Sequence, residues 1–154
     1  MVRIRKLTVF LDADVIFAGA ASPSEYGASH VVLRMGEITL IECLTSQQAV
    51  TEVERNLAEK LPTKLPEFRL LVSRCLRVVP DPEADDLLPY ADQADAKDLP
   101  ILVAALRERC PYLLTFNLRH YSPPAGTITV QQPGGFLLTV RGLLSQLSAE
   151  EAEK

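Results

Sequence analysis

The sequence predicts an α/β protein, a three-layer α/β/α sandwich around a central, mostly parallel five-stranded sheet. Two observations predict this class. Five short apolar segments rich in strand-forming residues alternate with segments of helical periodicity, which is typical of a parallel sheet covered by helices. The strand-like segments are apolar at nearly every position, as strands buried on both faces are. A chain of 154 residues suffices for one such domain, because about 68–70% of its unfolded surface can be buried.

The first strand is expected over residues 7–12, where an apolar run ends in acidic residues. A short helix should follow it through Ala20. The break at 22–24 separates that helix from one predicted for 25–35, with Ser24 as its N-cap.

The second strand is predicted for the continuous apolar run 38–44, and a helix over 46–60 follows it. Thr45 and Gln48 have the spacing of a capping box at the start of this helix, and Pro62 ends it. Because an α-helix turns by 100° per residue, its apolar side chains lie on one face of the helix. These are Ala49, Val50, Val53, Leu57 and Leu61.

A further helix is predicted for 67–75 and a third strand for 76–79. Residues 80–98 are rich in Asp and Glu and contain two prolines, which indicates a surface excursion with one short helix. The segment 99–106 is apolar on nearly every side and therefore predicts a central buried helix, with Asp98 as its N-cap.

The last third of the chain continues the alternation. The sequence predicts a fourth strand at 112–116, a loop at 117–121, a turn at 123–126, a fifth strand at 127–131 and a helix from after 133–135 to about 147. We therefore expect one domain over residues 1–148 and a polar, frayed tail at 149–154.

Composition agrees with a globular protein, with 47% hydrophobic and 23% charged residues. No apolar run approaches the roughly 18 residues of a membrane-spanning helix, and no cleavage site follows the N-terminal strand, so we expect a cytoplasmic protein with no membrane partner. Cys43, Cys75 and Cys110 are odd in number and lie in apolar surroundings, which predicts buried free thiols rather than disulfides or a zinc site.

Acidic and amide side chains recur where the predicted strands end or the next helix begins. They are Asp12, Asp14, Glu52, Asp95, Asp98 and Asn117. The carboxyl ends of parallel strands share one edge of the sheet, so these side chains could converge there. Converging carboxylates repel one another unless a cation lies between them, and hard cations such as Mg²⁺ or Mn²⁺ prefer such ligands.

A divalent cation held in this way can support phosphodiester hydrolysis without a Ser, Cys or His nucleophile. Consistently, the sequence contains no nucleophile elbow, P-loop or dinucleotide-binding motif. The net charge of −4 argues against a general nucleic-acid coat protein but not against a nuclease, because bound metal offsets the carboxylates. His120 either contacts a substrate phosphate or packs its loop.

Four motifs, in order, carry a family resemblance: residues 9–16 around Asp12, 50–57 around Glu52, 97–106 after Asp98, and 112–121 around Asn117. Together with the closing segment 129–137 they resemble the PIN-domain ribonucleases, over about residues 7–147. The toxins of VapBC-type toxin–antitoxin pairs belong to that family.

The resemblance implies specific roles. Asp12, Glu52 and Asp98 match the acidic metal ligands of the family, Asp95 is a candidate helper ligand, and Asn117 stands where many members have a fourth Asp. Asp14 stands where the family commonly has Asn. Thr115, Arg119 and His120, like Asp14, would orient the ligands or the substrate.

The resemblance therefore implies a ribonuclease dependent on Mg²⁺ or Mn²⁺ that hydrolyses RNA phosphodiester bonds. It also implies the toxin of a toxin–antitoxin pair, a cognate antitoxin protein as partner, and a homodimer.

Two other interpretations remain open on the sequence. Asp12-Ala13-Asp14 also resembles the motif of haloacid-dehalogenase-type phosphatases, with Asp12 as covalent nucleophile and Asp14 as acid/base, but a later acidic pair and a cap domain are missing. The neutral Asn117 alternatively suggests a PIN-like module that binds RNA or protein without cleavage.

Overall fold

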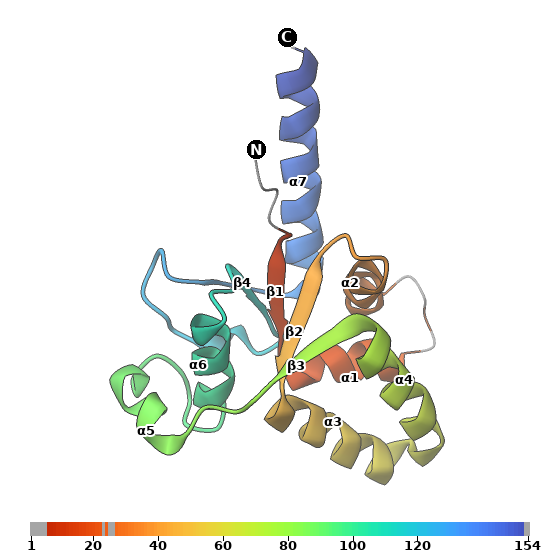
Figure 1. Cartoon of the computed structure of the whole chain (residues 1–154), viewed down its shortest axis with the longest axis vertical. Coiled ribbons are helices and arrows are strands. Elements are labelled where there is room, and N and C mark those ends of the chain that lie inside the picture. The colour runs from red at the N-terminus through yellow and green to blue at the C-terminus, as the bar shows by residue number, and fades with distance from the viewer. Residues whose placement is uncertain (1–5, 23, 25–26, 153–154) are drawn as a thin grey trace.

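The computed structural model describes residues 6–22, 24 and 27–152, and in them five strands form one parallel sheet (Figure 1). The strand order is β3-β2-β1-β4-β5. The strands are β1 (Thr8–Leu11), β2 (Glu42–Ser46), β3 (Leu76–Val79), β4 (Tyr112–Leu114) and β5 (Thr129–Gln131). Every pairing is parallel, so the predicted α/β class is confirmed.

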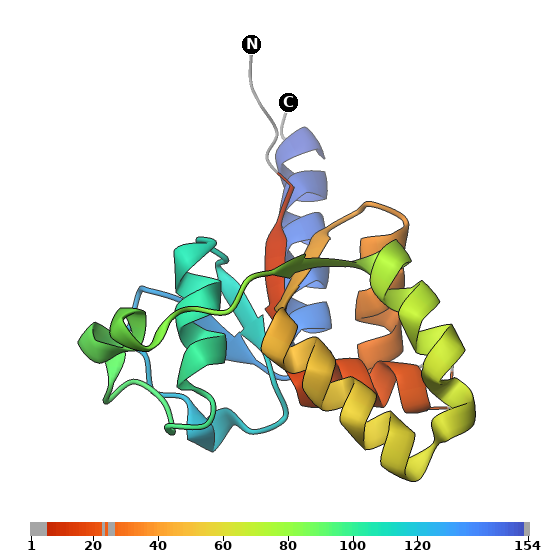
Figure 2. The ribbon, with the colours of Figure 1, turned by 60° about the horizontal axis from the view of Figure 1, so that its bottom comes forward.

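Seven α-helices accompany these strands in the described part of the chain. They are α1 (Ala13–Ala21), α2 (Ala28–Glu37), α3 (Gln47–Lys60), α4 (Leu65–Cys75), α5 (Ala84–Leu87), α6 (Leu99–Arg107) and α7 (Pro133–Ala152). Figures 1 and 2 show α6 on one side of the sheet and α1, α2 and α4 on the other, which is the predicted three-layer arrangement. The predicted surface excursion contains α5 and a 3₁₀ turn, η2 (Leu88–Tyr90).

The core is centred on β1, the middle strand of the sheet. Val9, Phe10 and Leu11 have no exposed surface, and Leu113 and Leu114 of the neighbouring strand β4 are equally buried. Burial of each such side chain stabilises the fold by about 1.5–3 kcal/mol. Helix α6 is buried along most of its length, as its uniformly apolar sequence predicts.

The carboxyl ends of β1, β2 and β4 are tied together by backbone and side-chain hydrogen bonds. Leu11 lies opposite Leu114, and the Asp12 N–H extends the ladder by donating to the Leu114 carbonyl at 3.0 Å. From β2, the Thr45 hydroxyl donates to the Leu11 carbonyl at 2.8 Å. The residues that leave β1 and β4 are therefore held side by side.

The prediction of the second strand was wrong by several residues. Strand β2 begins at Glu42, whereas the apolar residues Ile38 and Leu40 are exposed in a turn that closes α2. Thr39 has φ 65° in this turn, and the Leu40 N–H donates to the Met35 carbonyl at 3.0 Å. The strand was predicted from apolar residues, and Ile38 and Leu40 are apolar but exposed. The predicted strand therefore began in the turn.

Two predicted helix caps were also wrong. Gly27, not Ser24, is the N-cap of α2, while residues 25–26 of the predicted helix lie outside the described residues. For α3, the Ser46 hydroxyl accepts from the Ala49 N–H at 3.2 Å. The predicted cap, Thr45, still belongs to β2, where its hydroxyl donates a hydrogen bond to the Leu11 carbonyl.

Helix α7 is longer than predicted at both ends. It begins at Pro133, a residue well suited to the first helical position, and continues through Ala152. The segment predicted to fray is thus helical in its described part. Figure 1 shows the C-terminal half of α7 extending beyond the sheet. Neither this helix nor any other in the described residues is long and apolar enough to cross a membrane.

The three cysteines are buried free thiols, as predicted. Burial raises the pKa of the Cys43 thiol to about 12. It also raises the pKa values of Cys75 and Cys110 to about 11. At neutral pH these thiols are protonated and serve as small apolar core residues.

Candidate active site

Asp12 stands directly after β1 and is the most deeply embedded carboxylate of the acidic cluster, with only 6% of its surface exposed. It is the N-cap of α1, where its Oδ1 accepts from the Ala13 N–H at 2.7 Å. Its Oδ2 accepts from the Thr115 hydroxyl at 3.0 Å and from the Tyr121 hydroxyl at 2.7 Å. Three donors thus compensate the burial of this carboxylate.

Asp14 lies in the first turn of α1, and its two carboxylate oxygens have different environments. Oδ2 accepts from the Phe116 N–H at 3.0 Å, from Asn117 Nδ2 at 3.2 Å and from the Thr115 hydroxyl at 3.4 Å. Oδ1 is buried and has no hydrogen-bond partner among the described residues.

Burial and, after it, the charge of Asp12 raise the pKa of Asp14 to about 6. The N–H groups of Phe116 and Val15 and the Thr115 hydroxyl counteract this rise only in part. Asp14 is therefore a carboxylate whose ionised form is poorly compensated in the protein alone.

Asp98 occupies the N-cap position of α6, as predicted, but its side chain makes no capping hydrogen bond. Instead, Asp98 Oδ2 lies 2.8 Å from His120 Nδ1. Burial and the charge of Asp12 raise the pKa of Asp98, while His120 lowers it. The influence of Asp12 shows that Asp98 belongs to the same electrostatic cluster as the end of β1.

Asp95 joins this cluster through His120. The His120 Nε2 lies 3.9 Å from Asp95 Oδ2, and one ligand atom each from Asp95, Asp98 and His120 lie within 4.8 Å of one another. The backbone explains the arrangement. The Asp95 N–H donates to the His120 carbonyl at 2.8 Å, and the Ser122 N–H donates to the Gln93 carbonyl at 2.7 Å. This antiparallel bridge fastens the acidic excursion to the segment that follows β4.

Tyr121 is the site residue that the sequence did not reveal. It is 6% exposed, and its hydroxyl donates to Asp12. Burial and the surrounding carboxylates of Asp12, Asp98 and Asp14 raise the pKa of Tyr121 far above its usual value. The only sequence signal was its position beside His120, because its partner Asp12 lies 109 residues away.

Glu52 does not take part in the hydrogen bonds that join Asp12, Asp14 and Asp98 to the residues after β4. It lines a groove of about 570 Å³ on α3, together with Arg55, Asp81 and Lys97. Gln48 ties this groove to the start of α6, because its Nε2 donates to the Lys97 carbonyl at 3.4 Å. Among the residues that the structure describes, Glu52 has no hydrogen bond or ion pair with Asp12 or Asp98.

The residues after β4 divide into two groups. Thr115 is fully buried and bridges Asp12 and Asp14 through its hydroxyl. Asn117 is exposed, yet its amide contacts Asp14. Arg119 lies in the 3₁₀ turn η3 (Leu118–His120) and is exposed, so its charge is available to a ligand.

The donor set fits a hard divalent cation. Asp12, Asp14 and Asp98 offer carboxylate oxygens, one of which is buried without a partner. Their mutual repulsion contributes to the raised pKa values of Asp14 and Asp98, and a bound cation would reverse both shifts. Oxygen-rich sites of this kind suit Mg²⁺ or Mn²⁺.

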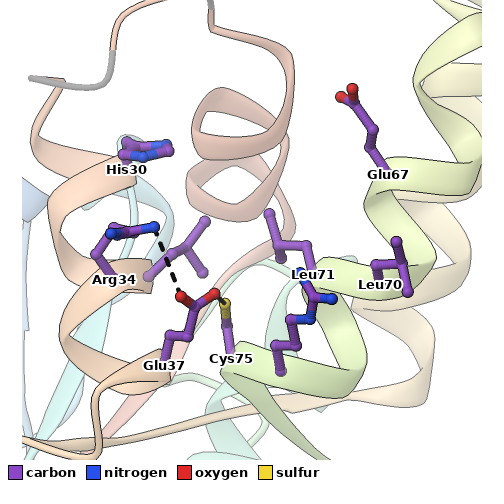
Figure 3. Close-up of a pocket in the computed structure, with 9 residues that line it drawn as sticks. His30, Arg34, Glu37, Glu67, Leu70, Leu71 and Cys75 are labelled. Carbon is purple, nitrogen blue, oxygen red and sulfur yellow. Dashed lines mark hydrogen bonds and ion pairs between the residues drawn. The ribbon is translucent and has the colours of Figure 1, made fainter.

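A separate pocket of about 210 Å³ lies between α2 and α4 (Figure 3). Three of its polar groups are paired with one another: Arg34 forms an ion pair with Glu37 at 3.5 Å, and Cys75 Sγ donates to Glu37 at 3.8 Å. His30 also lines this pocket. None of the acidic site residues lines it.

Comparisons with known proteins agree with the fold. A family model described as PIN domain matches residues 8–119. The solved structure of VapBC2 from Rickettsia felis, bound to a DNA fragment from its promoter, aligns with a TM-score of 0.61 at 13% identity, covering 82% of this chain and 98% of that chain. Mycobacterium tuberculosis VapC20, described as a Sarcin-Ricin loop cleaving toxin, aligns with a TM-score of 0.49 at 15% identity, covering 68% and 86%. Among curated protein sequences, none matches.

Proposed function

Because the chain belongs to the PIN-domain family, we propose that it is a divalent-metal-dependent endoribonuclease that hydrolyses RNA phosphodiester bonds. The observation that carries this proposal is the convergence of Asp12, Asp14 and Asp98 where β1 and β4 end. The charge of Asp12 raises the pKa values of both Asp14 and Asp98, in addition to the effect of burial. Such a cluster is costly in the protein alone and becomes favourable around a cation.

Asp12 and Asp98 would hold the cation, a Mg²⁺ or Mn²⁺ ion, with Asp95 and Glu52 as further ligands. When bound, such a cation polarises a phosphodiester and stabilises the charge that develops on the departing oxygen. Thr115 and Tyr121 keep the Asp12 carboxylate in one orientation, and His120 does the same for Asp98. These contacts fix the ligands before substrate arrives.

The groove beside Glu52 supplies a place for the RNA backbone. Arg55 and Lys97 line it, and Lys97 immediately precedes Asp98. Arg119 adds an exposed positive charge after β4. Cationic side chains of this kind contact phosphates and position a nucleic acid without reading its sequence. Asn117 would orient the Asp14 side chain rather than bind the cation.

Membership of the PIN-domain family also suggests a protein partner. We propose that the chain is the toxin of a toxin–antitoxin pair, acting in the cytoplasm and inhibited by a cognate antitoxin that occupies the acidic site. The fold similarity to Rickettsia felis VapBC2 supports this assignment.

We further propose a homodimer that forms through α7. One face of α7 packs against the core through Phe136 and Val140. Further along the helix the same face carries Leu143 and Leu147, which are 43% and 59% exposed. Leu144, beside them, is 55% exposed. This continuation has the three- and four-residue spacing of paired helices and carries no charge. A second copy, which presents the same surface about a two-fold axis, can bury it.

The function is tested with purified protein and RNA in the presence and absence of Mg²⁺ or Mn²⁺. Cleavage should require the metal and should be lost in Asp12→Asn and in Asp98→Asn. Asp92→Asn is the matched control, because it removes the same charge from an exposed residue of the acidic excursion. Folding of each variant is checked by circular dichroism.

Unchanged cleavage by the variant that carries both Asp12→Asn and Asp98→Asn would rule out the metal-nuclease assignment. Metal and RNA binding without cleavage would instead support a non-catalytic module. Release of phosphate from small phosphoesters, with an aspartyl-phosphate trapped at Asp12, would support the phosphatase.

A further inference from the structure

We propose that Asp14 binds the divalent cation directly through its Oδ1. The carboxylate nearest the end of β4 is then supplied by α1 and not by residue 117, which is Asn in this chain. This inference rests on the proposed function, because it assigns a further ligand at the same site. The resemblance to the PIN-domain family had implied an orienting role for Asp14.

The first argument is the asymmetry between the two oxygens of Asp14. Oδ2 is close to three donors, the Phe116 N–H, the Asn117 amide and the Thr115 hydroxyl. Oδ1 is buried and unpartnered among the described residues. A carboxylate that served only to hold the turn after β4 would need Oδ2 alone, and burial of the second oxygen would then be uncompensated.

The second argument concerns the position of Asp14 relative to the other carboxylates. The Thr115 hydroxyl lies 3.0 Å from Asp12 Oδ2 and 3.4 Å from Asp14 Oδ2, so one side chain sets the two carboxylates next to each other. The Tyr121 hydroxyl lies in the electrostatic field of Asp12, Asp98 and Asp14 together. Asp14 therefore shares one cluster with the two residues that the proposed function already assigns to the cation.

The third argument concerns Asn117. Its Nδ2 donates to Asp14 at 3.2 Å, so the neutral amide stabilises the ionised form of Asp14. A carboxylate at position 117 would repel the Asp14 carboxylate, whereas the Asn117 amide donates a hydrogen bond to it. Residues 14 and 117 together therefore contribute one negative charge to the site, and Asp14 carries it. Asn117 is accordingly a positioning residue for Asp14.

Binding of Mn²⁺ to the full-length protein, measured by electron paramagnetic resonance of the free ion without RNA, provides the first test. Asp14→Asn preserves the shape of the side chain and should weaken Mn²⁺ binding at least about tenfold, because loss even of a residue that only orients a metal ligand costs about 10–100-fold in affinity. Asp92→Asn should leave the affinity unchanged. An undiminished affinity in Asp14→Asn would overturn the proposal.

A lost orienting contact could also weaken binding, so the second test detects the bond itself. In Asp14→Cys, Cd²⁺ should produce a thiolate-to-cadmium charge-transfer absorption that saturates at one equivalent and that Mn²⁺ competes away. The wild-type protein is the background control, since its three cysteines are buried and protonated. Asp92→Cys controls for a thiol on the acidic surface, and Asp12→Cys is the positive control.

The outcomes separate this inference from the proposed function. Absorption in Asp12→Cys but not in Asp14→Cys would overturn the role of Asp14 and leave the metal site intact. A wild-type protein that binds no Mn²⁺ would overturn both. If Asp14→Cys does not fold, an undiminished Mn²⁺ affinity of Asp14→Asn still overturns the role of Asp14.

Discussion

The Tyr121 hydroxyl and the Asp12 carboxylate form a buried hydrogen bond of 2.7 Å at the centre of the site. A hydrogen bond to a charged group contributes more than a neutral one, and its loss leaves a buried carboxylate with one donor fewer. Tyr121 thus links the stability of the fold to the order of the site.

We expect Tyr121→Phe to lower the free energy of unfolding by about 1.5–3 kcal/mol at pH 7, because only the hydroxyl is removed. Urea denaturation of the metal-free protein measures this change. Tyr112→Phe is the matched control, since the Tyr112 ring packs edge-to-face with Phe136 and its hydroxyl forms no hydrogen bond among the described residues. Equal losses in the two variants would contradict a special role for the bond to Asp12.

Asp14 makes stability depend on pH. Its pKa is about 6 in the folded protein against an ordinary value of 3.8, so between these values the folded state holds a proton that the unfolded state has released. Stability should therefore fall as pH rises through this window. Asp14→Asn removes this contribution. We expect the variant to gain stability over the wild type as pH rises from about 4 to 7 in EDTA.

Thermal unfolding at several pH values measures this difference. The raised pKa of Asp98 acts in both proteins and largely cancels in the comparison. A difference between variant and wild type that stays constant with pH would show that burial does not penalise the Asp14 charge.

Among the candidate residues, those at the ends of apolar segments could be predicted from sequence alone. Asp12 directly follows the buried strand β1, and Asp98 directly precedes the buried helix α6. A charge next to a buried element requires a compensating partner. The unpartnered Oδ1 of Asp14 could not be predicted, since it depends on which oxygen the residues after β4 engage. Tyr121 could not be predicted either, because its partner Asp12 lies 109 residues away in the sequence, after the neighbouring strand β1.

At the scale of elements, α2 packs closely against β2 and the C-terminal end of α4 at Gly36. A Cβ at this position would lie 2.9 Å from the Cys75 carbonyl oxygen and 3.0 Å from Cys43 Sγ. The first of these atoms belongs to the backbone, which cannot move aside without displacing β3. Gly36 therefore fixes how near the helix approaches the sheet.

We expect Gly36→Ala to destabilise the protein by about 1–3 kcal/mol through overpacking. In contrast, Gly142 lies in α7 with open space around its Cα, so Gly142→Ala should stabilise by about 0.5–1 kcal/mol through helix propensity. Denaturant midpoints of the two variants give the comparison. A gain in stability at Gly36 would mean that α2 can withdraw from the sheet at no cost.

The elements themselves illustrate what sequence patterns can predict. Strand β3 has the predicted bounds because its apolar run is confined by a helix end and a proline. Strand β2 was placed too early, since an exposed turn supplied apolar residues at Ile38 and Leu40. The ladder hydrogen bonds that define a strand are formed with partners distant in sequence, and local composition does not report them.

At the scale of the whole molecule, α7 sets the expected assembly. The wild-type protein should elute and scatter light with twice the mass of one chain. Leu144→Asp should give the mass of a single chain, because a charge replaces part of the uncovered apolar face. Leu88→Asp is the control, since Leu88 is 72% exposed on η2, away from α7. A monomeric wild type would contradict the proposed dimer, and so would a dimeric Leu144→Asp.

The parallel sheet also governs when the site can come into being. Asp12 leaves the ribosome well before its hydrogen-bond donors Thr115 and Tyr121, which follow 103 and 109 residues later. Synthesis proceeds at about 5–20 residues per second, so Asp12 waits several seconds for them. Throughout that interval the nascent chain carries its key carboxylate without the environment that orders it. The acidic site can therefore become ordered only after residue 121 has been synthesised.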